Sequence, residues 1–234
     1  MNLSLRSYEK ELLDNDDIPY GDLLINLREL NIVNTLLGGH SITCKGVGHF
    51  HNKVPATKHL TIAEIGCGGG DNLFAIQKHL SGKGQQTKLI GIDIKPECIE
   101  YAQQTATQGV EWICSDYRTA NWAGDKPDVI FSSLFCHHFT DDELATQIRW
   151  MKDNSKLGFF INDLHRNTVA YYSIKVLTQL FSKSYLVKND APLSVRRAFK
   201  KNDWISIFSK AGIRNYDIKW HWAFRYLICV DNEH

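Results

Sequence analysis

A glycine-rich loop with a carboxylate at each end is the part of the sequence best suited to hold a ligand. The run from Glu64 to Asp71 reads EIGCGGGD and follows the apolar residues 61–65. Glycines allow the chain to turn sharply off a strand, and a ligand can approach the main chain closely because no Cβ is in the way. Because both ends of the run are acidic, the loop favours a ligand with a positive centre over a polyphosphate.

Two further carboxylates follow the next two apolar segments. Asp93 ends the segment 88–93, and Asp116 follows the segment 110–114. In an open sheet of parallel strands, ligands lie in the crevice beyond the carboxyl ends of the strands, where Glu64, Asp93 and Asp116 would form a row. Asp93 is suited to hold both hydroxyls of a ribose, and Asp116 to accept a hydrogen bond from an adenine amino group.

Other interpretations of these residues remain open. A dinucleotide loop reads Gly-x-Gly-x-x-Gly and binds pyrophosphate at a helix N-terminus, but Asp71 stands where its third glycine would fall. The loop 66–70 is also compatible with a tight turn that holds no ligand. Asp93 is equally able to cap the helix that opens near Pro96, and Asp116 to be an ordinary loop carboxylate.

The elements that would position these residues alternate between strand and helix. Short apolar runs separated by helical patterns predict a doubly wound α/β sheet of mostly parallel strands. The sequence after residue 199 predicts an amphipathic helix closed by Gly212 and then an antiparallel pair that completes a seven-stranded sheet. The predicted strands are 61–65, 88–93, 110–114, 128–132, 158–162, 214–219 and 222–230, and the predicted helices after residue 60 are 71–80, 96–105, 141–151, 169–181 and 200–211.

The first part of the chain has a different pattern. Leucines recur at helical spacing from Leu23 to Leu37, and Gly38 and Gly39 end the run. The signal between residues 40 and 60 is mixed, with glycines and Pro55 that indicate loop. We therefore expect a helical N-terminal extension over residues 1–58 and the main domain over residues 59–234.

Composition excludes several classes of protein. The chain has 234 residues, 43% of them hydrophobic, and a net charge of +1, so nothing in its charge indicates nucleic acid as a partner. Its most apolar helix, 169–181, is too short and polar to insert stably in a membrane, and we expect a lid over an apolar ligand or plain core. The six cysteines include no Cys-x-x-Cys pair, which favours reduced thiols in a cytoplasmic protein. A homodimer is compatible with these data.

Taken in order, four motifs resemble those of class I S-adenosylmethionine (SAM)-dependent methyltransferases. They are Glu64-x-Gly-x-Gly-x-Gly, Gly91-Ile92-Asp93, Ser115-Asp116 and the strand Pro127 to Phe131, within a resemblance that covers about residues 60–230. The resemblance implies a Rossmann-like fold, SAM as the cofactor and methyl transfer as the activity. The residues that it implies for cofactor binding are Glu64, Gly66, Cys67, Gly68, Gly70, Asp93, Ile94, Asp116, Tyr117 and Leu134.

Within that family, the segment Ser132 to Phe139 resembles the branch of ubiquinone and menaquinone methyltransferases. The segment Asp163 to Arg166 resembles bacterial methyltransferases of polyketide and phenolic-lipid pathways. These resemblances imply a small, hydrophobic or phenolic acceptor that is methylated on oxygen or carbon. An NAD-type oxidoreductase on a similar sheet and a SAM-binding module without activity are the alternatives.

Three histidines and two arginines are candidates for the chemistry. His138 and His165 are candidate general bases, because a neutral imidazole is accessible near pH 7. His137, Arg166 and Arg197 are candidates for binding the acceptor, although a basic group at 196–201 is usually a solvated face. Asp163 is a candidate for binding the acceptor or for capping the helix that follows.

We expect no metal site. Adjacent histidines such as His137 and His138 should point in different directions, and neighbouring ligands do not easily share one metal ion.

Overall fold

The computed structural model describes residues 3–15, 17–55, 57–82, 86–105, 109–120, 122 and 124–232, and its centre is one seven-stranded sheet. The strand order is β3-β2-β1-β4-β5-β7-β6. All neighbours from β3 to β5 pair in parallel, whereas β7 is antiparallel to both β5 and β6. The strands are β1 Leu60–Ile65, β2 Thr87–Asp93, β3 Val110–Cys114, β4 Val129–Ser133, β5 Gly158–Leu164, β6 Asp217–His221 and β7 Arg225–Asp231.

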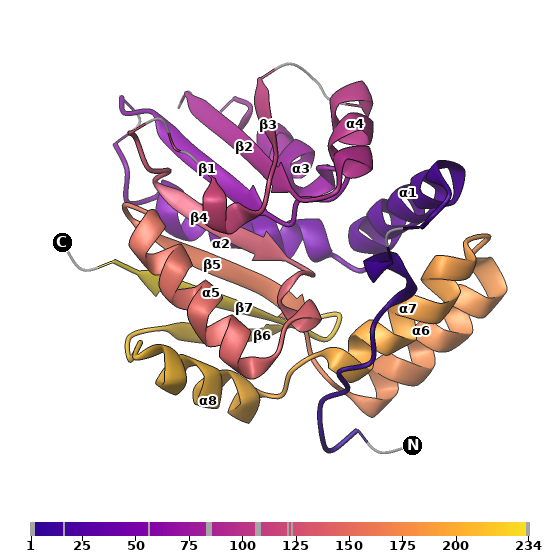
Figure 1. Cartoon of the computed structure of the whole chain (residues 1–234). Helices are drawn as coiled ribbons and strands as arrows, with labels where there is room; N and C mark the ends of the chain where they lie inside the picture. Colours follow the sequence, from indigo (N-terminus) through magenta and orange to yellow (C-terminus); the bar gives the residue numbers. More distant parts are fainter. Residues whose placement is uncertain are drawn as a thin grey trace.

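Helices cover both faces of the sheet (Figure 1). On one face, α5 and α8 pack together over an apolar cluster that includes Trp204 and Phe208. On the other, α2 and α3 pack over a cluster that includes Phe50, Phe131 and Phe160. The helices are α1 Tyr20–Leu36, α2 Gly39–His51, α3 Asp71–Leu80, α4 Pro96–Thr105, α5 Asp141–Asn154, α6 Thr168–Phe181, α7 Tyr185–Arg197 and α8 Lys201–Ala211.

This arrangement confirms the predicted fold class. Because the strand order reverses between β1 and β4, the crevice of the doubly wound sheet opens at the carboxyl ends of those strands. Three helices, α1, α6 and α7, lie beyond that end of the sheet (Figure 1). None of the helices within the described part of the chain is long and apolar enough to cross a membrane.

The predicted loop is wrong over residues 40–51, because Gly39–His51 form helix α2. The helix begins directly after Gly38, whose φ of +74° ends the preceding turn. Gly46 lies where α2 meets the sheet, and a Cβ at this position would come within 2.5 Å of the Phe160 ring. The glycine thus marks close packing of a helix on a strand, and the sequence pattern alone does not distinguish that from a loop.

The closing strand pair is confirmed, with shifted limits. β6 ends at His221 and β7 begins at Arg225. Trp222 and Phe224 therefore fall in the turn between the strands, where the sequence predicted strand. The displacement matters because this turn lies against one of the cavities described below.

Two glycines of α2 give a matched test of this packing. We expect Gly46→Ala to lower the free energy of unfolding by about 1–3 kcal/mol, because the added methyl group meets a buried aromatic ring. Gly48→Ala, in the same helix, has no atom within 4 Å of the added Cβ and should raise stability by up to about 1 kcal/mol through helix propensity. Denaturant unfolding measures both; equal effects of the two substitutions would contradict the packing described.

Candidate active site

The glycine loop turns off β1 in a conformation that few other residues adopt. Gly66, Gly68 and Gly70 have φ values of +66°, +51° and +77°. The loop is tied to the neighbouring strand because the Gly68 N–H donates to Asp93 Oδ2 at 2.8 Å. Asp93 therefore fixes the loop as well as lying at its edge.

The loop forms one wall of a cavity of about 750 Å³. The other walls come from the loop after β4, from α1 and from the N-terminal segment. Of the residues expected to bind a cofactor, those that line this cavity are Glu64, Gly66, Cys67, Gly68, Asp93, Ile94 and Leu134. These residues lie at or directly after the ends of β1, β2 and β4, whereas Asp116, the third carboxylate of the predicted row, does not line this cavity.

Glu64 lies at this cavity with an unused hydrogen-bond acceptor. Its Oε1 accepts from Asn72 Nδ2 at 2.9 Å, and its Oε2 has no hydrogen-bond partner within the described residues. Burial, with Asp71 and Asp93 nearby, raises the pKa of the Glu64 carboxyl well above its ordinary value. A buried acceptor without a partner is costly, so the site is built to receive a donor or a positive charge.

A second cavity continues from Asp93 toward β3. It shares Gly66, Asp93 and Ile94 with the first cavity and is also lined by Asp116 and Tyr117. Hydrogen bonds from Arg118 lower the pKa of Asp116, which stays charged, and burial raises the pKa of Tyr117 to about 12. The three carboxylates at the strand ends therefore follow one continuous crevice.

One residue of the loop does not belong to the site. Gly70 is absent from the linings of these cavities, and a Cβ on it would collide with the ring of Trp112. The expectation that Gly70 contacts a cofactor is therefore corrected. The glycine is needed there for packing and for the left-handed turn into α3.

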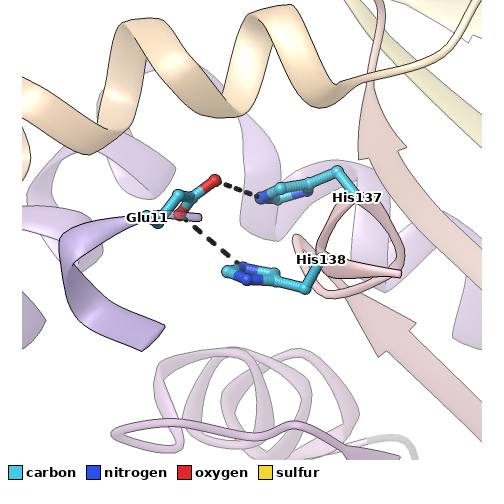
Figure 2. A group of neighbouring side chains, drawn as sticks. All are labelled: Glu11, His137 and His138. Atoms are coloured by element: carbon cyan, nitrogen blue, oxygen red, sulfur yellow. Dashed lines mark ion pairs between the residues drawn. The ribbon is translucent and has the colours of Figure 1, made fainter. Parts of the chain in front are cut away.

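The two adjacent histidines after β4 point the same way, contrary to expectation. Their ring centroids are 4.6 Å apart at an interplanar angle of 32°. Figure 2 shows both imidazoles facing Glu11. They occupy a short 3-10 turn, Cys136–His138, entered through Leu134 with φ of +53°. Carboxylates hold the rings: Asp163 Oδ1 lies 2.8 Å from His137 Nδ1, and Asp14 Oδ1 lies 2.8 Å from His138 Nδ1.

Glu11 completes this cluster and was missed by the sequence analysis. Its Oε1 lies 3.6 Å from His137 Nε2, and its Oε2 lies 3.7 Å from His138 Nε2. Burial raises the pKa of Glu11 to about 7. No periodic or motif signal surrounds Glu11 and Asp14, which lie in the segment before the first helix. Only the three-dimensional contacts identify them.

The same cluster is the set of described residues that could hold a metal ion. Ligand atoms of Glu11, His137 and His138 lie within 4.8 Å of one another. The reason given for excluding a metal, that the histidines point apart, is therefore wrong. Positive charge is nevertheless present already, because Arg197 Nε lies 3.8 Å from Glu11 Oε1. We interpret the cluster as a group that exchanges protons.

A third, mostly apolar cavity of about 380 Å³ lies on the far side of His138. Helices α1, α6 and α7 and the turn before β7 surround it, and His137 and His165 line it. It shares Leu13, Leu30, Leu134 and His138 with the large cavity. The two spaces therefore meet at the loop that carries the histidines.

Helix α6 covers this apolar cavity. Its residues Ala170, Ile174 and Leu177 line the cavity, whereas Tyr172 and Leu180 are exposed. The helix is therefore not plain core. Its N-terminus is capped by Asn167, whose Oδ1 accepts from the Val169 N–H at 2.8 Å, so the predicted capping role of Asp163 is wrong.

The two arginines predicted to bind an acceptor hold other parts of this chain, although Arg197 also lines the large cavity. Arg166 lines none of the three cavities; it donates to the carbonyls of Leu3 and Ser4 and pairs with Asp203. Arg197 is buried and does not lie on a solvated basic face. It donates to the His137 carbonyl at 3.0 Å and so positions the histidine loop.

Comparisons with known proteins agree with this geometry. Residues 62–158, which carry the glycine loop, Asp93 and Asp116, match a family described as a methyltransferase domain. None of the curated proteins compared with the sequence matches it. The structure of the plantazolicin methyltransferase BpumL in complex with SAH is similar, with a TM-score of 0.66 at 16% identity over 89% of this chain and 90% of that chain.

Two other solved structures are similar at comparable identity. Human N-acetylserotonin methyltransferase in complex with SAM gives a TM-score of 0.62 at 16% identity and covers 92% of this chain and 57% of that chain. Magnesium protoporphyrin IX methyltransferase from Synechocystis PCC 6803 with bound SAH gives 0.55 at 15% identity, with 84% of each chain covered. The fold of this chain is thus the Rossmann-like methyltransferase fold.

The residues of the crevice fit SAM. Glu64 offers an unpaired buried acceptor to an amino group, and Gly68 leaves the main chain open, because a Cβ there would have only Leu27 within 4 Å, at 3.8 Å. Asp93 lies between the two cavities, where a ribose would lie, and Asp116 and Tyr117 line the far end. The acidic crevice suits a cationic adenosine derivative.

Asp93 is the residue through which this fit is best tested. We expect Asp93→Asn to weaken binding of S-adenosylhomocysteine at least about tenfold, because a charged hydrogen bond is lost. The exposed Asp125 provides the control, and Asp125→Asn should bind as the wild type does. Isothermal titration calorimetry measures both. Unchanged affinity in Asp93→Asn would contradict the assignment of that carboxylate.

The raised pKa of Glu11 predicts a specific pH dependence of stability. The carboxyl titrates near its ordinary 4.5 when unfolded and at about 7 when folded, so the folded state binds the extra proton between these values. As pH rises from 4.5 to 7, the wild type should lose stability relative to Glu11→Gln by up to about 1.4 kcal/mol per pH unit. Denaturant unfolding at several pH values measures the difference. A control variant at the exposed Glu97 should keep the wild-type slope, and parallel curves for Glu11→Gln and wild type would contradict the prediction.

Proposed function

We propose that this protein is a SAM-dependent methyltransferase whose acceptor is a small, apolar molecule, methylated on a hydroxyl or on a carbon activated by a neighbouring phenolate. The observation that carries the proposal is the junction between the acidic cavity and the apolar cavity at Leu134 and His138. A methyl donor in the first cavity and an acceptor in the second would meet there. The resemblance to ubiquinone and menaquinone methyltransferases supports a phenolic acceptor.

The acidic cavity suits the cofactor. When bound, SAM supplies an electrophilic methyl group on a sulfonium. Glu64 would accept hydrogen bonds from the amino end, Asp93 from the ribose hydroxyls and Asp116 from the adenine amino group. These contacts fix the direction of the sulfonium, and correct alignment of two reacting groups can supply about 7–11 kcal/mol of a barrier.

The apolar cavity suits the acceptor. Its lining is mostly hydrocarbon, and its volume of about 380 Å³ is in the range of ligand sites. Helix α6 forms one wall of it, which supports the interpretation of residues 169–181 as a lid. Excluding water there protects the methyl group from hydrolysis.

His138 is our candidate for the general base. A carboxylate only accepts hydrogen bonds, so the bond to Asp14 leaves the proton on Nδ1 and the lone pair on Nε2. The proton of the acceptor hydroxyl would pass to Nε2, and the imidazolium so formed would be stabilised by Asp14 and Glu11. His137 lines the acceptor cavity, and its bond to Asp163 leaves its Nε2 free to contact the acceptor.

His165 fits a different role. Trp220 Nε1 donates to its Nδ1 at 3.2 Å, which leaves the proton on Nε2. Burial, with Arg166 and Lys200 nearby, lowers the pKa of His165. This residue lines the apolar cavity but not the acidic one, so it is suited to donate a hydrogen bond to the acceptor and less suited to be the base.

The two alternatives, an NAD-type oxidoreductase and a SAM-binding module without activity, would require other features at the site. A dinucleotide would place a pyrophosphate at the N-terminus of α3, but the first residue of that helix is Asp71, paired with His40 at 2.7 Å. A module that binds SAM without activity would have no need of a second, mostly apolar cavity with a histidine where the two cavities meet. We therefore favour the enzyme.

A direct assay tests the proposal. Purified protein is incubated with SAM and a panel of quinols, alkylphenols and hydroxybenzoic acids, and release of S-adenosylhomocysteine is measured alongside calorimetry with SAM and NAD. We expect SAM to bind and at least one phenolic acceptor to be methylated. Binding of NAD in place of SAM would support the oxidoreductase, and SAM binding without product across the panel would support the inactive module.

Once an acceptor is found, the two candidate bases can be separated. We expect His138→Gln to lower kcat about 10²–10⁴-fold, as is typical for loss of a general base, with little change in SAM affinity. The matched variant His165→Gln should change KM for the acceptor more than kcat. Steady-state kinetics distinguish the two patterns. If His165→Gln carried the loss of kcat and His138→Gln were active, the assignment of the base would be reversed.

A further inference from the structure

Arg225 is a buried arginine at the apolar cavity with an unused donor. It is only 2% exposed and lines the cavity described above. Its Nη2 donates to Asn34 Oδ1 at 2.7 Å, but its Nη1 has no hydrogen-bond partner among the residues described. Nor does any carboxylate oxygen of those residues lie within 4.0 Å of its guanidinium.

The other buried arginines differ from Arg225 in this respect. Arg6 pairs with Asp141, Arg166 with Asp203 and Arg197 with Asp14. Burying a charge without a counter-ion is costly, and most proteins avoid it by pairing. Burial lowers the pKa of Arg225 to about 10, while the carboxylates of Asp163 and Asp71, beyond ion-pair distance, oppose the lowering, so the side chain remains a cation at neutral pH. It is therefore a positive charge that lacks a direct partner.

The surrounding chain fixes the position of this guanidinium. A Cβ on Gly39, the first residue of α2, would lie 3.0 Å from Arg225 Cζ, so the glycine leaves room for the group. Asn34, from the last turns of α1, holds its other edge. A side chain with so little freedom would lose little entropy when it binds a ligand.

The cavity offers a second buried donor without a partner. Asn26, on α1, also lines the apolar cavity, and its Nδ2 has no hydrogen-bond partner in the described residues. Asn26 and Asn34 are eight residues apart, which corresponds to about 12 Å along a helix. Leu30, where the apolar and acidic cavities meet, lies between them. Asn26 Nδ2 and Arg225 Nη1 are thus both unused, whereas Asn34, which lines the acidic cavity, donates its Nδ2 to Asp71 Oδ2 at 3.0 Å.

We propose that Arg225 binds the carboxylate of the acceptor, and that the acceptor is an apolar, hydroxyl-bearing carboxylic acid. The proposal rests on the proposed function, because it takes the apolar cavity to be the acceptor site. A carboxylate is negatively charged and planar, and a guanidinium binds such a group through two parallel hydrogen bonds. Leu30 and Asn34 are one helical turn apart, so the carboxylate would lie within about 6 Å, along the helix, of the junction where the methyl group arrives.

The proposal predicts discrimination between an acid and its amide. The probes are 4-hydroxybenzoic acid with a pentyl chain on the ring and the corresponding carboxamide, titrated into the full-length protein in the presence of S-adenosylhomocysteine. We expect the acid to bind the wild type at least tenfold more tightly, since hydrogen bonds between charged groups exceed neutral ones by about that factor. Arg225→Gln should remove this preference, and Arg225→Lys should keep part of it. Arg214→Gln, at an exposed arginine between α8 and β6, is the control and should bind both probes as the wild type does.

Several results would overturn the proposal. These are equal binding of acid and amide to the wild type, an acid preference that survives in Arg225→Gln with thermal unfolding unchanged, or failure of both probes to bind a protein that binds S-adenosylhomocysteine. The comparison of acid and amide on the wild-type protein requires no variant, so it tests the proposal even if Arg225→Gln fails to fold. Methylation of neutral acceptors with no preference for acids would refute the role of Arg225 and leave the proposed function intact, whereas absence of SAM binding would refute the proposed function itself.

Discussion

The candidate active site depends on pairing two adjacent histidines with carboxylates from opposite sides. Asp163, at the end of β5, holds His137 from within the sheet, and Asp14, from the N-terminal segment, holds His138 from outside. Neighbouring imidazoles would otherwise separate to gain solvent and reduce repulsion. Because both Nδ1 atoms are engaged, both Nε2 atoms face Glu11, and of the two histidines His138 lines both cavities. The hydrogen bond between each imidazole Nδ1 and its carboxylate thus determines that Nε2 is the atom that can act as a base.

The same requirement explains how the N-terminal segment closes the site. Residues 3–11 of this segment form no helix or strand, and several hydrogen bonds of the segment join it to residues more than 100 positions away in the sequence. The N–H groups of Leu12 and Leu13 donate to Asp190, and Arg197 donates to the Glu9 carbonyl. Burial of these polar groups is tolerated because each has a partner. The wall of the acidic cavity is therefore held by charged hydrogen bonds, with few apolar contacts.

Local patterns allowed most of the sheet and the cofactor end of the site to be predicted. The glycine loop, Asp93 and Asp116 follow directly from strand ends, and the strand limits differ by only a few residues. The rest depends on long-range pairing. Glu11 and Asp14 lie in a segment without periodicity, and Gly46 resembles a loop glycine although it packs a helix on Phe160. The sequence does not indicate which of Arg166, Arg197 and Arg225 is without a carboxylate partner, because that depends on which distant residues fold against each of them.

The meeting of the two cavities at Leu134 and His138 has a physical reason in the proposed reaction. Both cavities carry charges of both signs, because Arg197 lines the acidic cavity beside its carboxylates and Glu11 lines the apolar cavity beside Arg225. In the proposed reaction, a cation on one side transfers its methyl group to an anionic or deprotonated nucleophile on the other. Charge is lost from both reactants as the transition state forms, so water, which stabilises separated charges best, would oppose the transfer. Exclusion of water at Leu134 and His138, where the two cavities meet, would remove that opposition, and alignment of the two reacting groups would lower the barrier further.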